Sequence, residues 1–229
     1  MLNGYRVICL THKLNSGIPS WDMSCDFHSH KIQDYDACET ETKFCVQKIN
    51  MPAGIGTHID APAHCMKEGL TVDQLSLDDL MTQCVMIDVS SQAHENFKAT
   101  IQDVESFETQ YGIIPKNSFV IFYTGWSKHW SVPQKYRNNL TFPSVSAEVA
   151  YFLVKRGVAG IGIDTLSPDR PKDGFKVHEI ILGAGKYIIE NIANADQLPP
   201  INAYSIALPI HFEGGTEAPI RLIAFIPKK

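Results

Sequence analysis

Short runs of β-branched and aromatic residues recur along this chain, and they limit the folds that it can adopt. Such runs are typical of β-strands, and those that are apolar throughout are typical of strands covered on both faces. We predict strands at Tyr5–Thr11, Phe44–Ile49, Cys84–Val89, Ser118–Thr124, Val158–Asp164, Lys186–Glu190, Tyr204–Leu208 and Ile220–Ile226. Buried strands of this kind need other elements to cover them.

Helix signals lie between some of these runs. Ser76–Leu80 opens with an N-cap residue followed by acids, and Ile101–Tyr111 is followed by Gly112, a residue type that commonly ends helices. Ser146–Arg156 begins with a capping residue, keeps apolar side chains along one side and is followed by Gly157. Because helices and strands do not alternate regularly, we expect an α/β fold with a mixed β-sheet and flanking helices.

The composition is that of a globular protein, with 44% hydrophobic and 20% charged residues. At 229 residues the chain suits one domain, so we expect a single compact domain that spans residues 1–229. A net charge of -5 gives no general attraction to nucleic acid or to anionic membranes. No apolar run approaches the ~20 residues that cross a bilayer. We therefore expect neither nucleic acid nor a membrane as the partner.

The cysteines and the start of the chain bear on the compartment. The six cysteines include no Cys-x-x-Cys pair, which argues against a zinc ribbon, and they are too few for a disulfide scaffold at this length. The first residues, MLNGYRVICLTHKL, lack the basic start and apolar core of a secretory signal. We expect a cytoplasmic protein with reduced thiols.

The segment Met51–Cys65, MPAGIGTHIDAPAHC, gathers side chains that bind metals. Pro62 disfavours helical backbone at the residue before it, so the segment is expected to be extended or looped. In an extended chain, residues two apart share a face, and His58 and Asp60 can therefore converge on one point. An imidazole beside a carboxylate suits a divalent cation such as zinc or manganese.

A second segment, HEIILGAGKYIIEN, runs from His178 to Asn191. Glu190 ends what is expected to be a buried strand. Burying an unpaired carboxylate is costly, so Glu190 needs a cation, a proton or hydrogen bonds. An ion pair with Arg221 or Lys186 is the alternative to a metal site.

Together these two segments resemble the cyclase family, which includes bacterial kynurenine formamidases and manganese-dependent isatin hydrolases. The core motif of the family reads His-x-Gly-Thr-His-x-Asp-x-Pro-x-His. The matching residues here are Gly56–His58, Asp60, Pro62, His64 and, further on, His178 and Glu190. Weaker likenesses lie at Pro19–Trp21, Thr124–Trp126, Gly162–Asp169 and Ala218–Arg221.

The resemblance implies the swivelling β/β/α fold of the family, a homodimer, and hydrolysis of a small amide, N-formyl amide, lactam or lactone, as in arylformamidases. It also implies a divalent metal, zinc or manganese. The implied ligands are His58, Asp60, His178 and Glu190.

Three further residues are candidates for work on the substrate. His64 lies just beyond the implied ligands, and an unperturbed imidazole pKa of ~6.5 suits a general base toward water and a general acid toward the leaving group. Trp21 and Trp126 are candidate walls of the substrate pocket, with core packing as the alternative for each.

One departure from the family pattern concerns the number of metal ions. The first histidine of the motif falls at Gly54, which offers no side-chain ligand. We therefore expect one ion per chain, unless His28, His30 or Cys65 takes the missing place. Two other functions stay open: a metal-dependent lyase or cyclase, and a non-catalytic homologue that binds without turnover. Because the other motif residues are retained, the sequence argues against the non-catalytic alternative.

Overall fold

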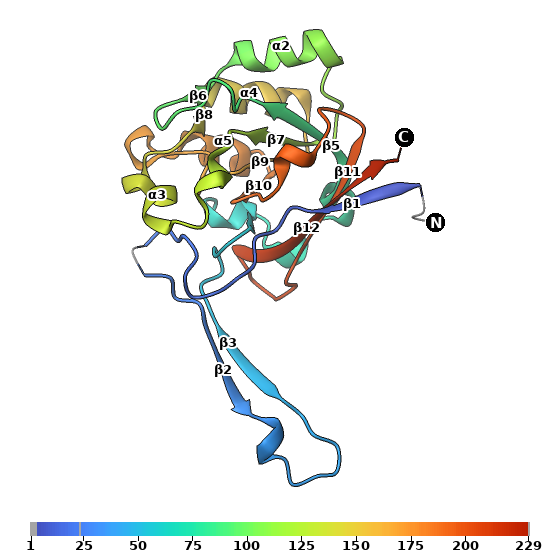
Figure 1. Cartoon of the computed structure of the whole chain (residues 1–229). Helices are drawn as coiled ribbons and strands as arrows, with labels where there is room; N and C mark the ends of the chain where they lie inside the picture. Colours follow the sequence, from blue (N-terminus) through green and yellow to red (C-terminus); the bar gives the residue numbers. More distant parts are fainter. Residues whose placement is uncertain (1–3, 23, 229) are drawn as a thin grey trace.

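The centre of the fold is a β-sheet that closes on itself (Figure 1). In the computed structural model, which describes residues 4–22 and 24–228, its strands follow the order β1-β12-β11-β5-β7-β9-β10-β4, and β4 also pairs with β12. The bounds are β1 Tyr5–Cys9, β4 His58–Asp60, β5 Met81–Asp88, β7 Phe119–Tyr123, β9 Gly160–Ile163, β10 Tyr187–Glu190, β11 Ala203–Pro209 and β12 Glu217–Pro227. The double pairing of β4 joins every strand of this sheet except β1 into a barrel-like ring.

The sheet is mixed, as predicted. The strands β5, β7, β9 and β10 pair with one another in parallel. The pairs that involve β1, β4, β11 and β12 are antiparallel. Three of the parallel strands, β7, β9 and β10, are buried along nearly their whole length, which is the usual condition of parallel strands.

Two apolar cores lie on opposite faces of the closed sheet. Ile121 and Ile189 belong to the inner core, which the ring encloses. Ile161 and Ile188 face outward and pack with apolar residues of α2, α4 and α5, which lie together on one side of the sheet (Figure 1). The helices are α1 Leu77–Leu80, α2 Ile101–Tyr111, α3 Pro133–Arg137, α4 Ala147–Arg156 and α5 Lys176–Gly183. Because neighbouring residues of a strand point to opposite faces, one apolar run serves both cores.

The predicted helices form where their capping residues place them. The Ser146 side chain accepts a hydrogen bond from the backbone N–H of Val149 at the start of α4. Gly157, with a φ of +72°, ends the same helix. Helix α2 likewise has the predicted bounds and is followed by Gly112. The predicted fold class, an α/β domain with a mixed sheet and flanking helices, is confirmed.

The sequence does not predict α5 or β2, for different physical reasons. Helix α5 begins after Phe175, which has a φ of +54° and no side chain that caps the helix. The strand β2, His28–Gln33, reads HSHKIQ and has no apolar run.

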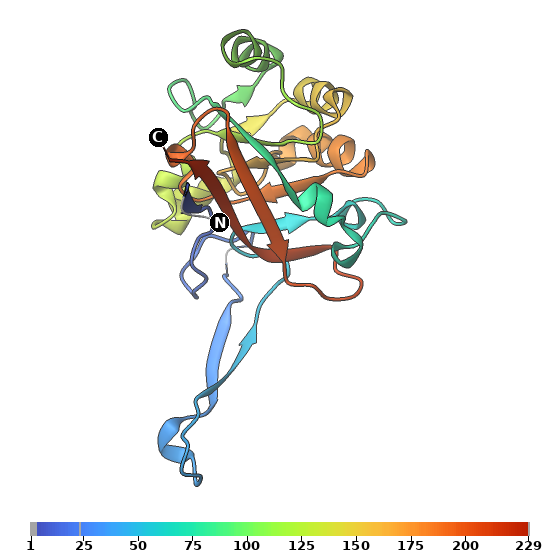
Figure 2. The ribbon, with the colours of Figure 1, turned by 90° about the vertical axis from the view of Figure 1, so that its right-hand side faces the viewer.

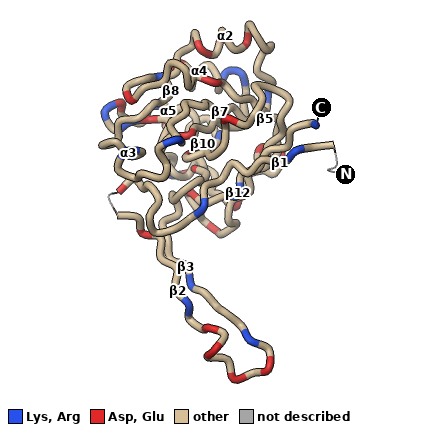
Figure 3. Tube along the Cα trace, in the orientation of Figure 1, with Lys and Arg blue, Asp and Glu red and all other residues tan. Residues whose placement is uncertain are grey.

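The strand β2 pairs with β3, Val46–Asn50, in a hairpin that projects from the body of the protein (Figures 1 and 2). All residues of both strands are exposed. The predicted strand at Phe44–Ile49 therefore forms outside the main sheet. Acidic residues gather at the tip of the hairpin (Figure 3), where the chain carries Asp34, Asp36, Glu39 and Glu41.

A third, short sheet consists of β6, Lys98–Ala99, and β8, Ser144–Val145. Across the described part of the chain, no helix combines the length and the apolar character that a membrane crossing requires.

Gly160 lies between two aromatic rings of the inner core. It pairs with Phe119 on one side and with Tyr187 on the other, and the centroids of these two rings are 5.6 Å apart. A Cβ atom on Gly160 would lie 2.5 Å from two carbons of the Tyr187 ring, which is closer than packed atoms approach. The two rings thus require a residue without a side chain between them.

We predict that Gly160→Ala lowers the free energy of unfolding by about 1–3 kcal/mol, because the buried Tyr187 ring must move to admit the methyl group. Chemical denaturation measures this difference. Gly4→Ala is the matched control, since an added Cβ there meets nothing within 4 Å. We expect it to change the free energy by less than about 0.5 kcal/mol. Equal stability of the two variants would contradict the prediction.

Candidate metal centre

The three-residue strand β4 holds two of the predicted ligands between two partner strands. His58 lies opposite Glu190 of β10, and Asp60 lies opposite Glu217 of β12. Residues directly opposite in an antiparallel pair point to the same face, and so do residues two apart in one strand. All four side chains therefore share one face of the sheet, while Ile59 between them enters the inner core.

Helix α5 brings His178 to the same face. Its Nε2 lies 3.6 Å from Oδ2 of Asp60 and 3.4 Å from Oε1 of Glu190. Its Nδ1 lies 2.9 Å from a carboxylate oxygen of Asp169, which also accepts the backbone N–H of His178. A carboxylate can only accept from Nδ1, so Nε2 is left to face the centre. Metal-binding histidines are commonly oriented by such a carboxylate.

A backbone carbonyl orients His58 in the same way. We assign Nδ1 as the donor to the carbonyl oxygen of Gly56, 2.9 Å away, because a carbonyl can only accept. Nε2 then faces Asp60 at 3.4 Å and Glu190 at 3.5 Å. The same Gly56 carbonyl accepts a hydrogen bond from the side chain of Asn191, the residue after Glu190. The two strands β4 and β10 thus hold each other's site residues in place.

The centre is buried and rich in negative charge. Asp60 is 1% exposed and Glu190 is 6% exposed. Among the described residues, Oδ1 of Asp60 has no hydrogen-bond partner. Two buried carboxylates, one with an unpartnered oxygen, are costly unless a cation lies between them.

Two overlapping groups of side chains have the spacing of metal ligands. In each group, one donor atom per residue lies within 4.8 Å of the others. The groups are Asp60, His178 and Glu190, and His58, Asp60 and Glu217. Imidazole nitrogens and carboxylate oxygens are the donors that zinc and manganese take, so these residues fit a divalent ion.

The pKa shifts of His58, His178 and Asp60 also show that the centre favours positive charge. Burial lowers the pKa of His58, but the Asp60 and Glu190 carboxylates outweigh burial and raise this pKa to about 10. For His178, burial is likewise outweighed, by Asp169, Asp60 and Glu190, and the pKa lies well above its ordinary value. Burial acts upward on the pKa of Asp60, yet the two imidazoles hold this pKa below its usual range.

The four predicted ligands therefore converge on one centre, and their role as ligands stays a prediction. They are His58, Asp60, His178 and Glu190. The ion pairs of Glu190 are with the two histidines. The alternative partners, Arg221 and Lys186, do not pair with it in the described structure.

Glu217 belongs to the same centre, although the sequence gives little sign of it. Its side chain is 23% exposed, and its Oε2 lies 3.4 Å from Nδ1 of His64. The only local signal is a carboxylate directly before the apolar run of β12. Its place beside Asp60 depends on the register of β12 against β4, which the sequence does not state.

A cavity of about 460 Å³ lies over the centre, a volume that suits a small molecule. Trp21 lines this cavity together with Phe175, and the ring centroids of the two are 5.9 Å apart. The role of Trp21 as a wall of the substrate pocket stays a prediction. The Phe175 ring stands edge-on to the His178 ring at 6.0 Å. His64, in a 3₁₀ turn at Pro62–His64, also lines the cavity, with its ring 6.0 Å from that of His178.

Trp126 does not line this cavity, which corrects its prediction as a substrate wall. Its indole N–H donates to the backbone carbonyl of Tyr136, and its ring packs with Tyr136, Phe142 and Leu166 in a separate apolar cluster. The core-packing alternative therefore describes Trp126.

None of the three residues considered as replacements at Gly54 joins the ligand groups of the described structure. His28 and His30 lie on the exposed strand β2, in the projecting hairpin (Figure 1). Cys65 lines the cavity but belongs to neither group.

Comparisons with known proteins agree with this geometry. The Cyclase family model matches residues 8–170. The chain belongs to the cyclase family. A curated relative, kynurenine formamidase of Bacillus cytotoxicus, is 30% identical over 220 residues, which cover 94% of this chain and 95% of that protein.

Solved structures of this family are similar along nearly the whole chain. Isatin hydrolase A from Ralstonia solanacearum has a TM-score of 0.89 and 27% identity, covering 97% of this chain and 92% of that chain. A protein described as a potential metal-dependent hydrolase with cyclase activity has a TM-score of 0.77 and 26% identity, covering 98% and 100% of the two chains. The predicted family and the predicted enzyme class, a hydrolase, are confirmed.

We predict that binding of a divalent ion to the metal-free protein releases protons. At pH 7.5 the raised pKa values keep His58 and His178 protonated, so an ion that binds their nitrogens displaces about one proton from each. Affinity should therefore rise with pH up to about 10, the pKa of His58. Calorimetry in buffers of different ionisation enthalpy counts the protons.

The control is His58→Ala, which should release about one proton fewer. The sign for stability follows from the same shift: protonated His58 stabilises the metal-free fold fully below about pH 6.5, and this contribution is lost as the pH rises toward 10. A binding enthalpy that does not depend on the buffer would contradict the prediction.

Proposed function

We propose that this protein hydrolyses a small amide, N-formyl amide, lactam or lactone in the cavity over the metal centre. The observation that carries the proposal is the convergence of two imidazoles and two buried carboxylates on the floor of that cavity. The names of the similar proteins, isatin hydrolase and kynurenine formamidase, support an amide or cyclic amide as the bond that is cleaved.

The proposed cofactor is zinc or manganese, held through the donors of the candidate centre. When bound, such an ion lowers the pKa of water and polarises a carbonyl oxygen. Asp169 and the Gly56 carbonyl contribute by holding the two imidazoles with Nε2 toward the centre.

His64 is the proposed proton carrier. Its Nδ1 faces Glu217 at 3.4 Å, and a proton held there leaves the lone pair of Nε2 for the attacking water. The hydrogen bond to Glu217 raises the pKa of His64, although burial acts against it. This interaction stabilises the imidazolium that forms when His64 takes the proton. The imidazolium then donates that proton to the leaving group.

Two aromatic rings that line the cavity, those of Trp21 and Phe175, form an aromatic wall that favours a flat substrate. Trp21 and Phe175 are 36% and 37% exposed, so each presents ring surface to the cavity and to solvent. The backbone carbonyl of Trp21 accepts a hydrogen bond from Arg137 at 2.8 Å, which anchors the loop that carries the indole. Rings stack on flat substrates with little conformational entropy to lose.

We predict that His64→Ala lowers kcat by about 10²–10⁴-fold on an amide that the protein cleaves, because the variant has no group to carry the proton. The metal content should not change, since His64 belongs to neither ligand group. Steady-state kinetics on isatin and on an aryl formamide, with elemental analysis of the same sample, measure both quantities.

His94→Ala is the matched control, because His94 is exposed and does not line the cavity. An unchanged kcat in His64→Ala with metal still bound would remove His64 from the mechanism. Turnover in ¹⁸O-labelled water separates the reaction classes: hydrolysis places solvent oxygen in the product, and a lyase reaction does not.

A homodimer and a cytoplasmic location complete the proposal. The six cysteines are free, which fits a reducing compartment. The projecting hairpin exposes Ile32, Val46 and Ile49, which are 61%, 41% and 56% exposed. A two-stranded hairpin is marginally stable alone in water, so these apolar residues favour contact with a second copy of the chain.

We predict that Ile32→Lys combined with Ile49→Lys shifts a dimer toward monomer, since both changes replace an exposed apolar side chain of the hairpin with a charge. Light scattering at micromolar concentration measures the mass. Leu77→Lys is the control, because Leu77 is 61% exposed but lies on α1. A monomeric wild type, or a double variant that stays dimeric, would refute the role of the hairpin.

A further inference from the structure

The space beside Gly54 is already filled. Gly54 lines the cavity just before β4, at the position where the family motif has its first histidine. A Cβ atom built on Gly54 would overlap Oε1 of Glu217 and would lie 3.5 Å from Nε2 of His58. The Glu217 carboxylate therefore occupies the volume that a side chain at position 54 would use.

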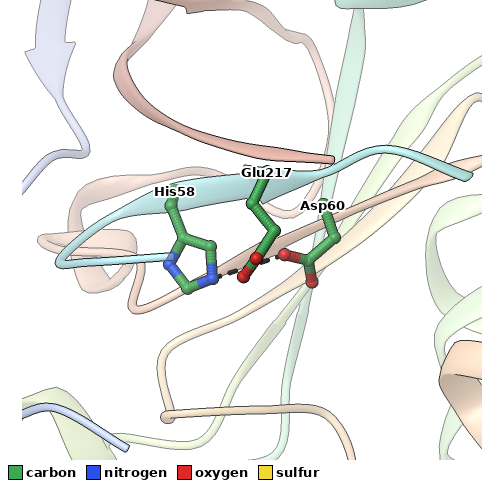
Figure 4. A group of neighbouring side chains, drawn as sticks. All are labelled: His58, Asp60 and Glu217. Carbon is green, nitrogen blue, oxygen red and sulfur yellow. Dashed lines mark ion pairs between the residues drawn. The ribbon is translucent and has the colours of Figure 1, made fainter. Parts of the chain in front are cut away.

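The strand register brings this carboxylate to the ligands of β4. Glu217 lies directly opposite Asp60 in the β4–β12 pair. One donor atom each from His58, Asp60 and Glu217 lies within 4.8 Å of the others. In Figure 4 the His58 ring and the carboxylates of Asp60 and Glu217 extend toward the same side of their strands, and the dashed line marks the ion pair between His58 and Asp60.

The charges of this group call for a cation. Two carboxylates placed directly opposite in a sheet repel one another. Asp60 is 1% exposed, so water does little to screen that repulsion. Its Oδ1, the oxygen 3.4 Å from Nε2 of His58, is also one of the buried side-chain atoms that have no hydrogen-bond partner among the described residues.

We propose that Glu217 is a metal ligand that replaces the side chain absent at Gly54. His58, Asp60 and Glu217 then hold one divalent ion, and Asp60, His178 and Glu190 hold another, with Asp60 between them. This inference rests on the proposed metal-dependent function and revises the expectation of one ion per chain. The ion at Glu217 meets two carboxylates and one imidazole, a set rich in oxygen that suits manganese.

The contact between Glu217 and His64 suggests an alternative to metal binding. Oε2 of Glu217 lies 3.4 Å from Nδ1 of His64, so Glu217 could act only by positioning that imidazole. The two roles predict different measurements. A ligand affects how many ions the protein holds, whereas a positioning residue affects the pH profile of the reaction and leaves the ions in place.

The test counts ions in the full chain. Metal-stripped protein is titrated with Mn²⁺ alone and, separately, with Zn²⁺, by calorimetry and elemental analysis. We expect two ions per wild-type chain and one in both Glu217→Gln and Glu217→Ala. In these variants the affinity for the second ion should fall by more than the ~10–100-fold that is typical of removing a partner outside the ligand set. Glu213→Ala, an exposed residue on the preceding loop, should keep two.

A ligand exchange tests the same idea in the opposite direction. Gly54→His alone should not add an ion, because the new side chain meets the Glu217 carboxylate. Gly54→His combined with Glu217→Ala removes that overlap and supplies an imidazole, so the count should return to two. Circular dichroism confirms that each variant is folded before its ions are counted.

Three results would overturn the inference. Two ions of unchanged affinity in both Glu217 variants, with a shifted pH profile of activity, would assign Glu217 to His64. A single ion in an active wild type would leave the hydrolase proposal standing and remove Glu217 from the ligands. A wild type that binds neither metal would reject the proposed function and this inference together.

Discussion

The pairing of β4 with β10 on one side and β12 on the other is the interaction on which the rest of the structure depends. It closes the sheet, and through its register it places His58 against Glu190 and Asp60 against Glu217. The same backbone hydrogen bonds that complete the fold therefore press carboxylates together in a buried place. That arrangement is unfavourable for the polypeptide alone and favourable once positive charge is present, whether as protons on the imidazoles or as a divalent ion.

Much of the fold follows from local physical rules. The apolar runs became strands because β-branched and aromatic residues pack on both faces of a covered sheet, and α4 begins and ends where Ser146 and Gly157 cap it. The convergence of His58 and Asp60 follows from the two-residue period of a strand. His178 and Glu190 were predicted as ligands from the family resemblance alone, because no local rule places them beside β4.

The features that the sequence did not predict depend on register or on unusual backbone. Glu217 is near Asp60 only because β12 pairs with β4 in one particular alignment. Phe175 forms the aromatic wall from a backbone conformation with positive φ, which a bulky residue rarely adopts. Trp126 was misassigned because the spacing of its motif does not show which way the indole points, and here its N–H faces Tyr136.

The closed sheet also sets the order in which the metal centre can form. The partners of β4 lie in the second half of the chain, with Glu217 close to its end, so these contacts close very long loops. Contacts of that kind form slowly and late in folding. During synthesis His58 and Asp60 leave the ribosome long before Glu190 and Glu217, so the candidate site is incomplete until the end of the chain is made. A divalent ion held by these residues would therefore stabilise the closed barrel and not its earlier, open forms.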